Sequence, residues 1–224
     1  MNRAAKDALF EAIAQVVQAA ANPHRLELLD LLIQAPRTVE QLADASALTV
    51  ANTSQHLQRL KRAGLVATER RGTSIRYAIA STSVARLWIE LRAVATQHLA
   101  AMDRALDGYR PQRHQFATIT PEEVRAGLAR GDVVLLDVRP HIEFDAGHLP
   151  GAQSVPLDAL PRRLAELPTD VLLVTYCRGP LCVYADEALA QILASGRRGA
   201  RLEEGVAEWQ QAGYPLEPSA ARPN

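Results

Sequence analysis

The pattern of apolar residues changes part-way along the chain, and this change limits the folds open to it. Up to about residue 106, apolar residues recur at the three- and four-residue spacing of amphipathic helices. Beyond residue 116, continuous apolar runs appear at 133–136 and 171–174, which is typical of strands buried on both faces of a sheet. We therefore predict two domains, at 1–107 and 116–219, joined by a linker at 108–115.

The segment between the two patterns is polar and aperiodic and contains Gly108 and Pro111, as expected of a linker. The chain has no net charge, but the charge is unevenly distributed. Residues 1–115 contain 15 Lys and Arg against 10 Asp and Glu, and residues 116–224 contain 10 against 15. A basic first half is compatible with binding to nucleic acid, but an excess of this size does not establish it.

No apolar stretch reaches the roughly 20 residues that span a bilayer, and the first 21 residues lack a signal-peptide core. We therefore expect a cytoplasmic protein with no membrane partner. Its two cysteines are Cys177 and Cys182. In a reducing cytosol, two close cysteines are more often reactive or metal-binding than a permanent disulfide. Because no further cysteine is present, the pair is a poor zinc site, and we expect neither a metal nor another cofactor.

The first half is predicted to be mainly α-helical, with a winged helix-turn-helix at its centre. Capping residues and helical spacing predict a short helix at 38–45 and a second helix from Thr49 to Ala63. A β-hairpin with a basic tip follows. A second helix of this kind fits the major groove of DNA and presents its N-terminal side chains to base edges. Further helices are expected at 4–20, from Pro23 to near Pro36, and at 82–106.

Polar and basic side chains lie where such a unit would meet double-stranded DNA. Each of them is equally compatible with an ordinary solvated surface, so the prediction depends on their combination. The candidates for base contacts are Thr49, Asn52, Thr53, Ser54, Gln55 and His56. The candidates for phosphate contacts are Arg59, Lys61, Arg62, Arg70, Arg71 and Arg76.

The stretches 22–29 and 53–66 closely resemble the ArsR family of bacterial winged-helix repressors, and the resemblance extends over roughly residues 5–105. It implies a homodimer formed through the helices at 4–20 and 82–106, which binds a short inverted repeat in a promoter. It also implies base contacts from residues 53–56 and a wing at 70–76. Many family members sense metals or persulfides through cysteines in this domain. Because the first half has none, we expect the signal to enter elsewhere.

In the second half, the stretches 135–140 and 143–152 resemble the first signature of rhodanese domains, and 204–215 resembles the closing one. The resemblance covers about residues 116–217. The buried strands alternate with expected helices at 121–130, 158–166 and 183–195, which predicts an α/β domain with a largely parallel sheet. We expect Asp137 and Arg139 to form a structural pair.

The loop Cys177-Arg178-Gly179-Pro180-Leu181-Cys182 follows a predicted strand and precedes a predicted helix. Backbone N–H groups in such a loop can converge on an anion, and the helix dipole adds to the effect. We therefore expect Cys177 to be largely a thiolate, able to attack a sulfane sulfur and hold it as a persulfide. The resemblance implies the same role for this position.

The end of the loop differs from the family. A rhodanese loop commonly ends in an Arg that helps to bind an anionic donor, and here Cys182 stands in that place. Arg178 is then the remaining cation of the loop, so we expect any sulfurtransferase activity to be weak. Cys182 is interpreted as a resolving thiol that attacks a persulfide on Cys177, giving a disulfide or a bridged polysulfide. The alternative is that Cys182 is an ordinary small apolar residue at a helix start.

Three functions remain open from the sequence. The first is a DNA-binding transcriptional regulator that senses reactive sulfur species, or an oxidant, through Cys177 and Cys182. The second is an enzyme, a sulfurtransferase or a dithiol oxyanion reductase, with Cys177 as nucleophile. The third is a constitutive DNA-binding protein whose second domain recruits a partner.

Overall fold

The computed structural model describes residues 2–218, with the exception of the side chain of Arg71. The predicted end of the second domain at 219 lies outside these residues. The chain forms two compact units that divide between Leu91 and Arg92, within helix α5 (Thr82–His98). The limits of independently folding domains, which the sequence places at 107 and 116, remain predictions. No described helix has the length and apolar character needed to cross a membrane.

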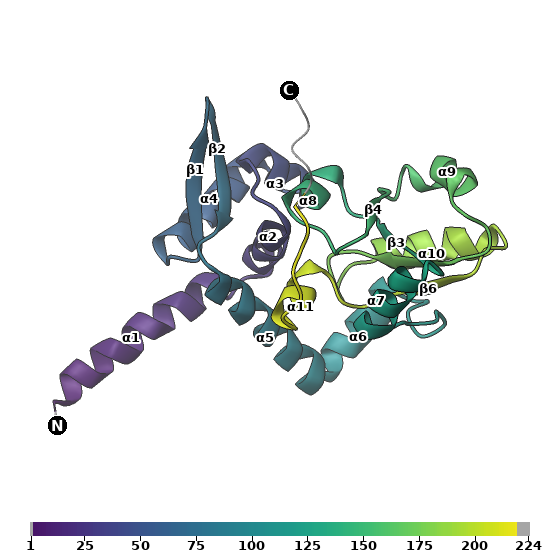
Figure 1. Ribbon diagram of the computed structural model, residues 1–224. Coiled ribbons are helices and arrows are strands. Elements are labelled where there is room, and N and C mark those ends of the chain that lie inside the picture. Colours follow the sequence, from purple (N-terminus) through teal and green to yellow (C-terminus); the bar gives the residue numbers. More distant parts are fainter. Residues whose placement is uncertain (1, 219–224) are drawn as a thin grey trace. The chain divides into compact units, whose positions relative to one another are not determined.

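The first unit is a winged helix-turn-helix, as predicted (Figure 1). Three of its helices begin at the predicted caps, because the side chains of Asn22, Thr38 and Thr49 each accept a backbone N–H from the first turn of the helix that follows. The hairpin is antiparallel. The elements before α5 are α1 (Arg3–Ala20), α2 (Pro23–Gln34), α3 (Val39–Ala45), α4 (Val50–Arg62), β1 (Val66–Arg71) and β2 (Ser74–Ile79).

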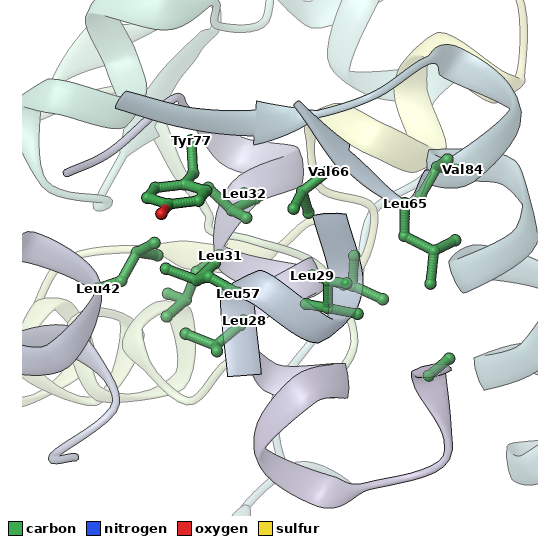
Figure 2. Close-up of a cluster of buried hydrophobic side chains, with 12 residues drawn as sticks. Leu28, Leu29, Leu31, Leu32, Leu42, Leu57, Leu65, Val66, Tyr77 and Val84 are labelled. Atoms are coloured by element: carbon green, nitrogen blue, oxygen red, sulfur yellow. The ribbon is translucent and has the colours of Figure 1, made fainter. Parts of the chain in front are cut away.

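Leucine side chains from α2, α3 and α4 form the core of this unit. Leu28, Leu42 and Leu57 are fully buried, and Figure 2 shows them gathered near the ring of Tyr77, which comes from the hairpin. Burial of each leucine stabilises the fold by roughly 1.5–3 kcal/mol. This packing fixes one face of α4 against α2 and leaves the opposite face of α4 in solvent.

Most of α1 lies outside this core. Leu9, Phe10, Ile13 and Val17 are each between 61% and 67% exposed, whereas Ala20 at the end of the helix is buried. Figure 1 shows α1 leading away from α2. An apolar stripe that is left in water along a helix marks a surface for association.

The helix predicted at 82–106 is in fact two helices, so the prediction of one continuous helix is wrong. Helix α5 ends at His98, and α6 (Ala100–Tyr109) begins after Leu99. The backbone of Leu99 is extended, with φ −111° and ψ 105°. Neither glycine nor proline marks the break, which explains why the spacing of apolar residues did not predict it.

The second unit contains a parallel sheet with the strand order β4-β3-β5-β6, which confirms the predicted α/β fold. Because every strand pair is parallel, the carboxyl ends of the strands meet at one edge, which is where ligands bind in such sheets. The elements after α6 are α7 (Pro121–Arg130), β3 (Val133–Asp137), α8 (His141–Ala146), β4 (Gln153–Ser154), α9 (Leu160–Arg163), the 3₁₀ turn η1 (Leu164–Glu166), β5 (Leu172–Tyr176), α10 (Tyr184–Ala194), β6 (Gly199–Arg201) and α11 (Val206–Gln211).

A buried polar network fixes the carboxyl end of β5. The predicted pair is confirmed: Arg139 Nη2 lies 2.6 Å from Asp137 Oδ2, and both side chains are fully buried. The hydroxyl of Tyr176 donates to the same carboxylate at 2.5 Å and accepts the Leu149 N–H at 3.1 Å. Tyr176 is therefore held to β3, and the loop that starts at the next residue has a fixed origin.

Candidate functional site

Residues 177–183 connect β5 to α10, so the cysteine loop lies between a strand end and a helix start, as predicted. Cys177 and Cys182 are both free thiols, 1% and 8% exposed. Gly179 has a φ of 122°, a value that L side chains rarely adopt, and its carbonyl accepts the Cys182 N–H at 3.1 Å. The loop therefore curls back on itself and brings the two cysteines together.

The surroundings of Cys177 favour its thiolate. Burial alone would raise the pKa of this thiol, but several contacts outweigh it and lower the pKa to about 7. In order of size these are a hydrogen bond with the side chain of Cys182, the positive charge of Arg201, and the backbone N–H groups of Ala185 and Gly179. When protonated, the Cys177 thiol instead donates to the carbonyl of Cys182, 3.4 Å away. The chain therefore holds a substantial fraction of Cys177 as thiolate near neutral pH.

Cys182 behaves in the opposite way. The hydrogen bond to Cys177 is the largest cause that raises the pKa of Cys182 well above its ordinary value, followed by burial and by the charge on Cys177. Cys182 is thus a protonated donor toward a neighbouring thiolate. The two thiols therefore differ: Cys177 is the nucleophilic one, and Cys182 carries a proton that it shares with Cys177 through a hydrogen bond.

Arg178 is already paired. Its guanidinium lies 2.7 Å and 3.0 Å from Glu143 Oε1, and the Glu143 side chain, from α8, is fully buried. The Tyr184 ring packs 5.3 Å from the same guanidinium. A cation held by a carboxylate has little charge left for an anionic donor, so this pairing reinforces the expectation of weak activity with thiosulfate.

Two further arginines donate hydrogen bonds to backbone carbonyls of the loop. The sequence did not predict either of them. Arg201, at the end of β6, donates to Gly179 O at 3.3 Å and to Cys182 O at 3.2 Å. Arg110 lies in the segment predicted as a linker, yet it is 2% exposed and donates to Pro180 O at 2.6 Å. Both arginines also bond Asp186 in the first turn of α10. Because the partners of these arginines are distant in sequence, the spacing of apolar residues does not predict this role.

In the first unit, the outer face of α4 carries part of the predicted DNA-contacting set. Asn52 and Gln55 are exposed and Ser54 is half-buried, so these side chains are accessible to a partner. Thr49 is exposed, but its hydroxyl accepts the Asn52 N–H at 3.2 Å as the helix cap. Thr53, another of the six predicted readers, faces inward.

The structure corrects the prediction that Thr53 contacts a base. Its side chain is fully buried, and its hydroxyl donates to Thr49 O at 3.0 Å. His56 is half-buried with its ring 5.7 Å from that of His24. Burial, followed by the charge of Arg25, lowers the pKa of His56. His56 therefore packs as a neutral ring toward α2, and its contact with DNA stays a prediction.

The basic residues around α4 and the hairpin are mostly on the surface. Lys61 Nζ donates to Thr68 Oγ1 at 2.9 Å, which ties the end of α4 to β1. Arg76 is half-buried and donates to Pro36 O at 2.5 Å, so part of its hydrogen-bonding capacity serves the fold. The structure does not describe the side chain of Arg71. The exposed members are Arg59, Lys61, Arg62 and Arg70.

Among residues 2–218, no group of three or more histidine, cysteine, aspartate or glutamate side chains is arranged to hold a metal ion.

Comparison with known proteins gives a family match for each of the two units. Residues 22–68 match the family described as bacterial regulatory protein, arsR family, and residues 120–212 match the rhodanese-like domain. The chain is 42% identical, over 215 residues, to the HTH-type transcriptional regulator Rv0324 of Mycobacterium tuberculosis. The match covers 96% of this chain and 94% of that protein. The chain belongs to the ArsR family of transcriptional regulators and carries a rhodanese-like domain.

Other relatives match one unit of the regulator at a time. Over 108 residues it is 37% identical to the probable adenylyltransferase/sulfurtransferase MoeZ of Mycobacterium tuberculosis, covering 46% of this chain and 27% of that protein. Among solved structures, the homodimeric winged helix-turn-helix DNA-binding domain of Mb0332 from Mycobacterium bovis is 42% identical, with a TM-score of 0.42. That match covers 45% of this chain and 92% of the other. The family matches of the regulator include α4 in the first unit and the whole cysteine loop in the second.

Proposed function

We propose that this ArsR-family regulator senses reactive sulfur species through Cys177 and Cys182 and converts their modification into a change in affinity for promoter DNA. The observation that carries the proposal is the pairing of a Cys177 thiol with a pKa of about 7 and a hydrogen-bonded, protonated Cys182. The first unit contains no cysteine. The loop is therefore the place where sulfur chemistry can enter the regulator.

The proposed chemistry takes place in two displacement steps, and hydrogen disulfide (HSSH) serves as the simplest donor. The Cys177 thiolate attacks one sulfur, the S–S bond breaks, and HS⁻ leaves, so Cys177 becomes a persulfide. Cys182 then attacks the inner sulfur of the persulfide, which forms the Cys177–Cys182 bond and releases a second HS⁻. The first HS⁻ takes up the proton that Cys177 gave up on ionising, and the second, which already carries the persulfide hydrogen, takes the Cys182 proton. The two thiols are oxidised to a disulfide, and the donor is reduced to two molecules of hydrogen sulfide.

The environment of the loop favours a single conversion over rapid turnover. Cys177 is only 1% exposed, so a donor must be small. Arg178 is held by Glu143, so a doubly charged anion finds little free positive charge at the loop. A nearby thiol that closes a disulfide would end each reaction cycle until a reductant restores the pair. These features suit a stoichiometric sensor.

For the first unit, we propose that it binds an inverted repeat in promoter DNA as a homodimer. The exposed side chains of Asn52 and Gln55 on α4 supply hydrogen-bonding groups for base edges, and the surrounding arginines and lysine supply phosphate contacts. The apolar stripe on α1, from Leu9 to Val17, is the surface that a second copy would cover.

The test combines mass spectrometry with DNA binding by the full chain. The probe DNA is a fragment selected from a random library by the reduced protein. With sulfide-derived polysulfide, the wild type is expected to lose two hydrogens or gain a bridging sulfur, and its affinity for the DNA to change at least tenfold. Cys182→Ser should stop at the persulfide, with the mass of added sulfur. If Cys177→Ser shows the same change in DNA affinity as the wild type, the proposal is wrong.

A second candidate function is sulfurtransferase turnover at Cys177. The similarity over 108 residues to a probable adenylyltransferase/sulfurtransferase favours it. This function predicts steady-state sulfur transfer that depends on Cys177. It also predicts that the donor leaves the affinity for DNA unchanged. Both results together would mean that the protein is an enzyme and not a sensor.

A further inference from the structure

Arg110 is the first residue after α6, and its guanidinium is saturated with acceptors. Arg110 Nε and Nη2 lie 2.6 Å and 3.1 Å from the two carboxylate oxygens of Asp186. Nη2 and Nη1 lie 3.1 Å and 3.2 Å from those of Glu203, and Nη1 reaches Pro180 O at 2.6 Å. These hydrogen bonds raise the pKa of Arg110, which therefore stays charged although it is buried. A bidentate arginine in such a cluster is fixed in orientation as well as in place.

The contact with Pro180 orients a peptide group within the cysteine loop. In a planar trans peptide, the carbonyl and the following N–H point in opposite directions. Because Arg110 holds the Pro180 carbonyl, the N–H of Leu181 is directed away from Arg110. The carbonyls of Gly179 and Cys182 are held in the same manner by Arg201. The two arginines thus fix three carbonyls of the loop, those of Gly179, Pro180 and Cys182.

The same arginines determine the charge near Cys177. Arg201 is one of the groups that favour the thiolate, and it shares Asp186 with Arg110. If Arg110 were absent, the Asp186 carboxylate would be compensated by Arg201 alone, and the effect of Arg201 on Cys177 would weaken. The other groups around this cluster are Cys182 in the loop, Glu203 after β6, and the Arg178–Glu143 pair. Glu208 of α11 also lies beside Gly179, and its carboxylate pairs with Arg92.

The C-terminal end of α6 is therefore attached to the loop. The backbone N–H of Arg110 completes the last turn of α6 by donating to Leu106 O at 2.6 Å, and Leu106 is buried. The neighbouring Tyr109 lies within electrostatic range of Cys182, since burial first and then Cys182 raise the pKa of its phenol. Helix α6 follows α5 after the single residue Leu99.

We propose that Arg110 is a positioning residue that makes the conformation of the Cys177 loop and the order of the C-terminal end of α6 depend on each other. This inference rests on the proposed function for its biological meaning, because α6 leads through α5 to the DNA-binding unit. By linkage the dependence runs both ways. Loss of the Arg110 contacts disfavours the Cys177 thiolate, and displacement of the loop by modification of Cys177 loosens α6.

The test uses the full chain with iodoacetamide as the probe and needs neither a sulfur donor nor DNA. First, the rate at which Cys177 is alkylated is measured against pH for the wild type, Arg110→Met and Arg110→Lys. Arg130→Met is the control, because Arg130 is exposed and pairs with Asp132, outside both α6 and the loop. Second, hydrogen exchange of residues 100–110 is compared before and after alkylation.

The wild type is expected to show a midpoint near pH 7. Arg110→Met should move it up by about one pH unit, which slows alkylation at pH 7 about fivefold. Arg110→Lys should lie between the two, and Arg130→Met should match the wild type. Alkylation of the wild type should speed exchange in residues 100–110, whereas in Arg110→Met exchange starts fast and changes no further.

The proposal is overturned if Arg110→Met, folded by circular dichroism, keeps the wild-type midpoint, or if alkylation of the wild type leaves exchange in α6 unchanged. If Arg110→Met does not fold, Arg110→Lys is the deciding variant. The proposal is then overturned if Arg110→Lys gives the wild-type result in both measurements. Because no polysulfide or DNA is involved, a failed sensor hypothesis would leave this result standing.

Discussion

The N-terminal part of α4 and the Cys177 loop are both segments where a helix begins, but they treat their polar groups in opposite ways. On α4, Asn52 and Gln55 stand in solvent, and the backbone of the helix start is satisfied by its own cap, Thr49. In the loop, the two reactive side chains are buried, and neighbouring arginines hold the backbone carbonyls. The first arrangement presents side chains to a large partner. The second surrounds one sulfur atom with backbone groups that are held in place.

This difference shows how one chain can serve the two tasks that we propose for it. A surface that binds DNA must stay exposed and needs only correct side chains. A thiol that must be ionised near neutral pH needs an environment that excludes water and supplies compensating donors, and such an environment takes residues from several elements. The predictions below test this contrast.

The largest effect is expected within the loop itself. Cys177, with a pKa of about 7, should be alkylated increasingly as the pH rises through 7, because only the thiolate reacts. Cys182 has a pKa well above its ordinary value, so it stays protonated at pH 7 and its alkylation should be on the order of 100-fold slower. Peptide mapping by mass spectrometry after timed alkylation measures both rates. Equal rates at pH 7 would contradict the assigned roles of the two thiols.

The next effect separates the exposed and buried faces of α4. Gln55→Ala removes an exposed hydrogen-bonding side chain and should weaken specific DNA binding about tenfold, within the roughly 1–3 kcal/mol of a base contact. Thr53→Val removes a buried hydroxyl and should leave DNA preference unchanged while lowering the free energy of unfolding by about 1 kcal/mol.

Fluorescence anisotropy with selected and scrambled DNA, together with urea unfolding, distinguishes these two variants of α4. Loss of sequence preference in Thr53→Val, without loss of stability, would restore Thr53 as a reader.

The smallest effect concerns the cation of the loop. Glu143→Gln keeps the shape of the side chain but removes the negative charge beside Arg178. The freed guanidinium should bind thiosulfate more tightly, so the concentration that half-protects Cys177 from alkylation should fall about threefold to fivefold. The variant should also be less stable, because one charge of a buried pair is left alone.

Glu166→Gln is the control for this charge change, since Glu166 pairs with Arg163 on the exposed surface and should have no effect on protection. Unchanged protection in Glu143→Gln would mean that Arg178 does not face the space that a donor enters.

Much of the fold was predictable because its signals are local. Helix caps such as Thr38 and Thr49, and the apolar run of β3, specify their elements within a few residues. The inward position of Thr53 also had a local signal, because Thr53, Leu57 and Leu60 share one face of a helix at the spacing of a core stripe. The resemblance to a reader position outweighed that signal, and the prediction was wrong.

The candidate site was predictable only in part. Cys177 and Cys182 stand out by residue type, and their loop lies where the strand and helix pattern places it. The partners that set the chemistry of the loop do not stand out in the sequence. Glu143 lies 35 residues from Arg178, and Arg110 lies 76 residues from Asp186. Long-range pairs of this kind depend on how parallel strands bring their ends together, which no window of sequence contains.

The burial of Arg110 has a consequence for how this regulator could have been assembled from separate genes. A fragment that begins at residue 116 contains the sheet and both thiols but loses a guanidinium that serves Asp186, Glu203 and Pro180 at once. A rhodanese-like module joined to a DNA-binding module at that point would carry two undercompensated carboxylates beside its loop. Because the compact unit that contains the loop begins at Arg92, a separate rhodanese-like module must start before residue 110 to keep this guanidinium.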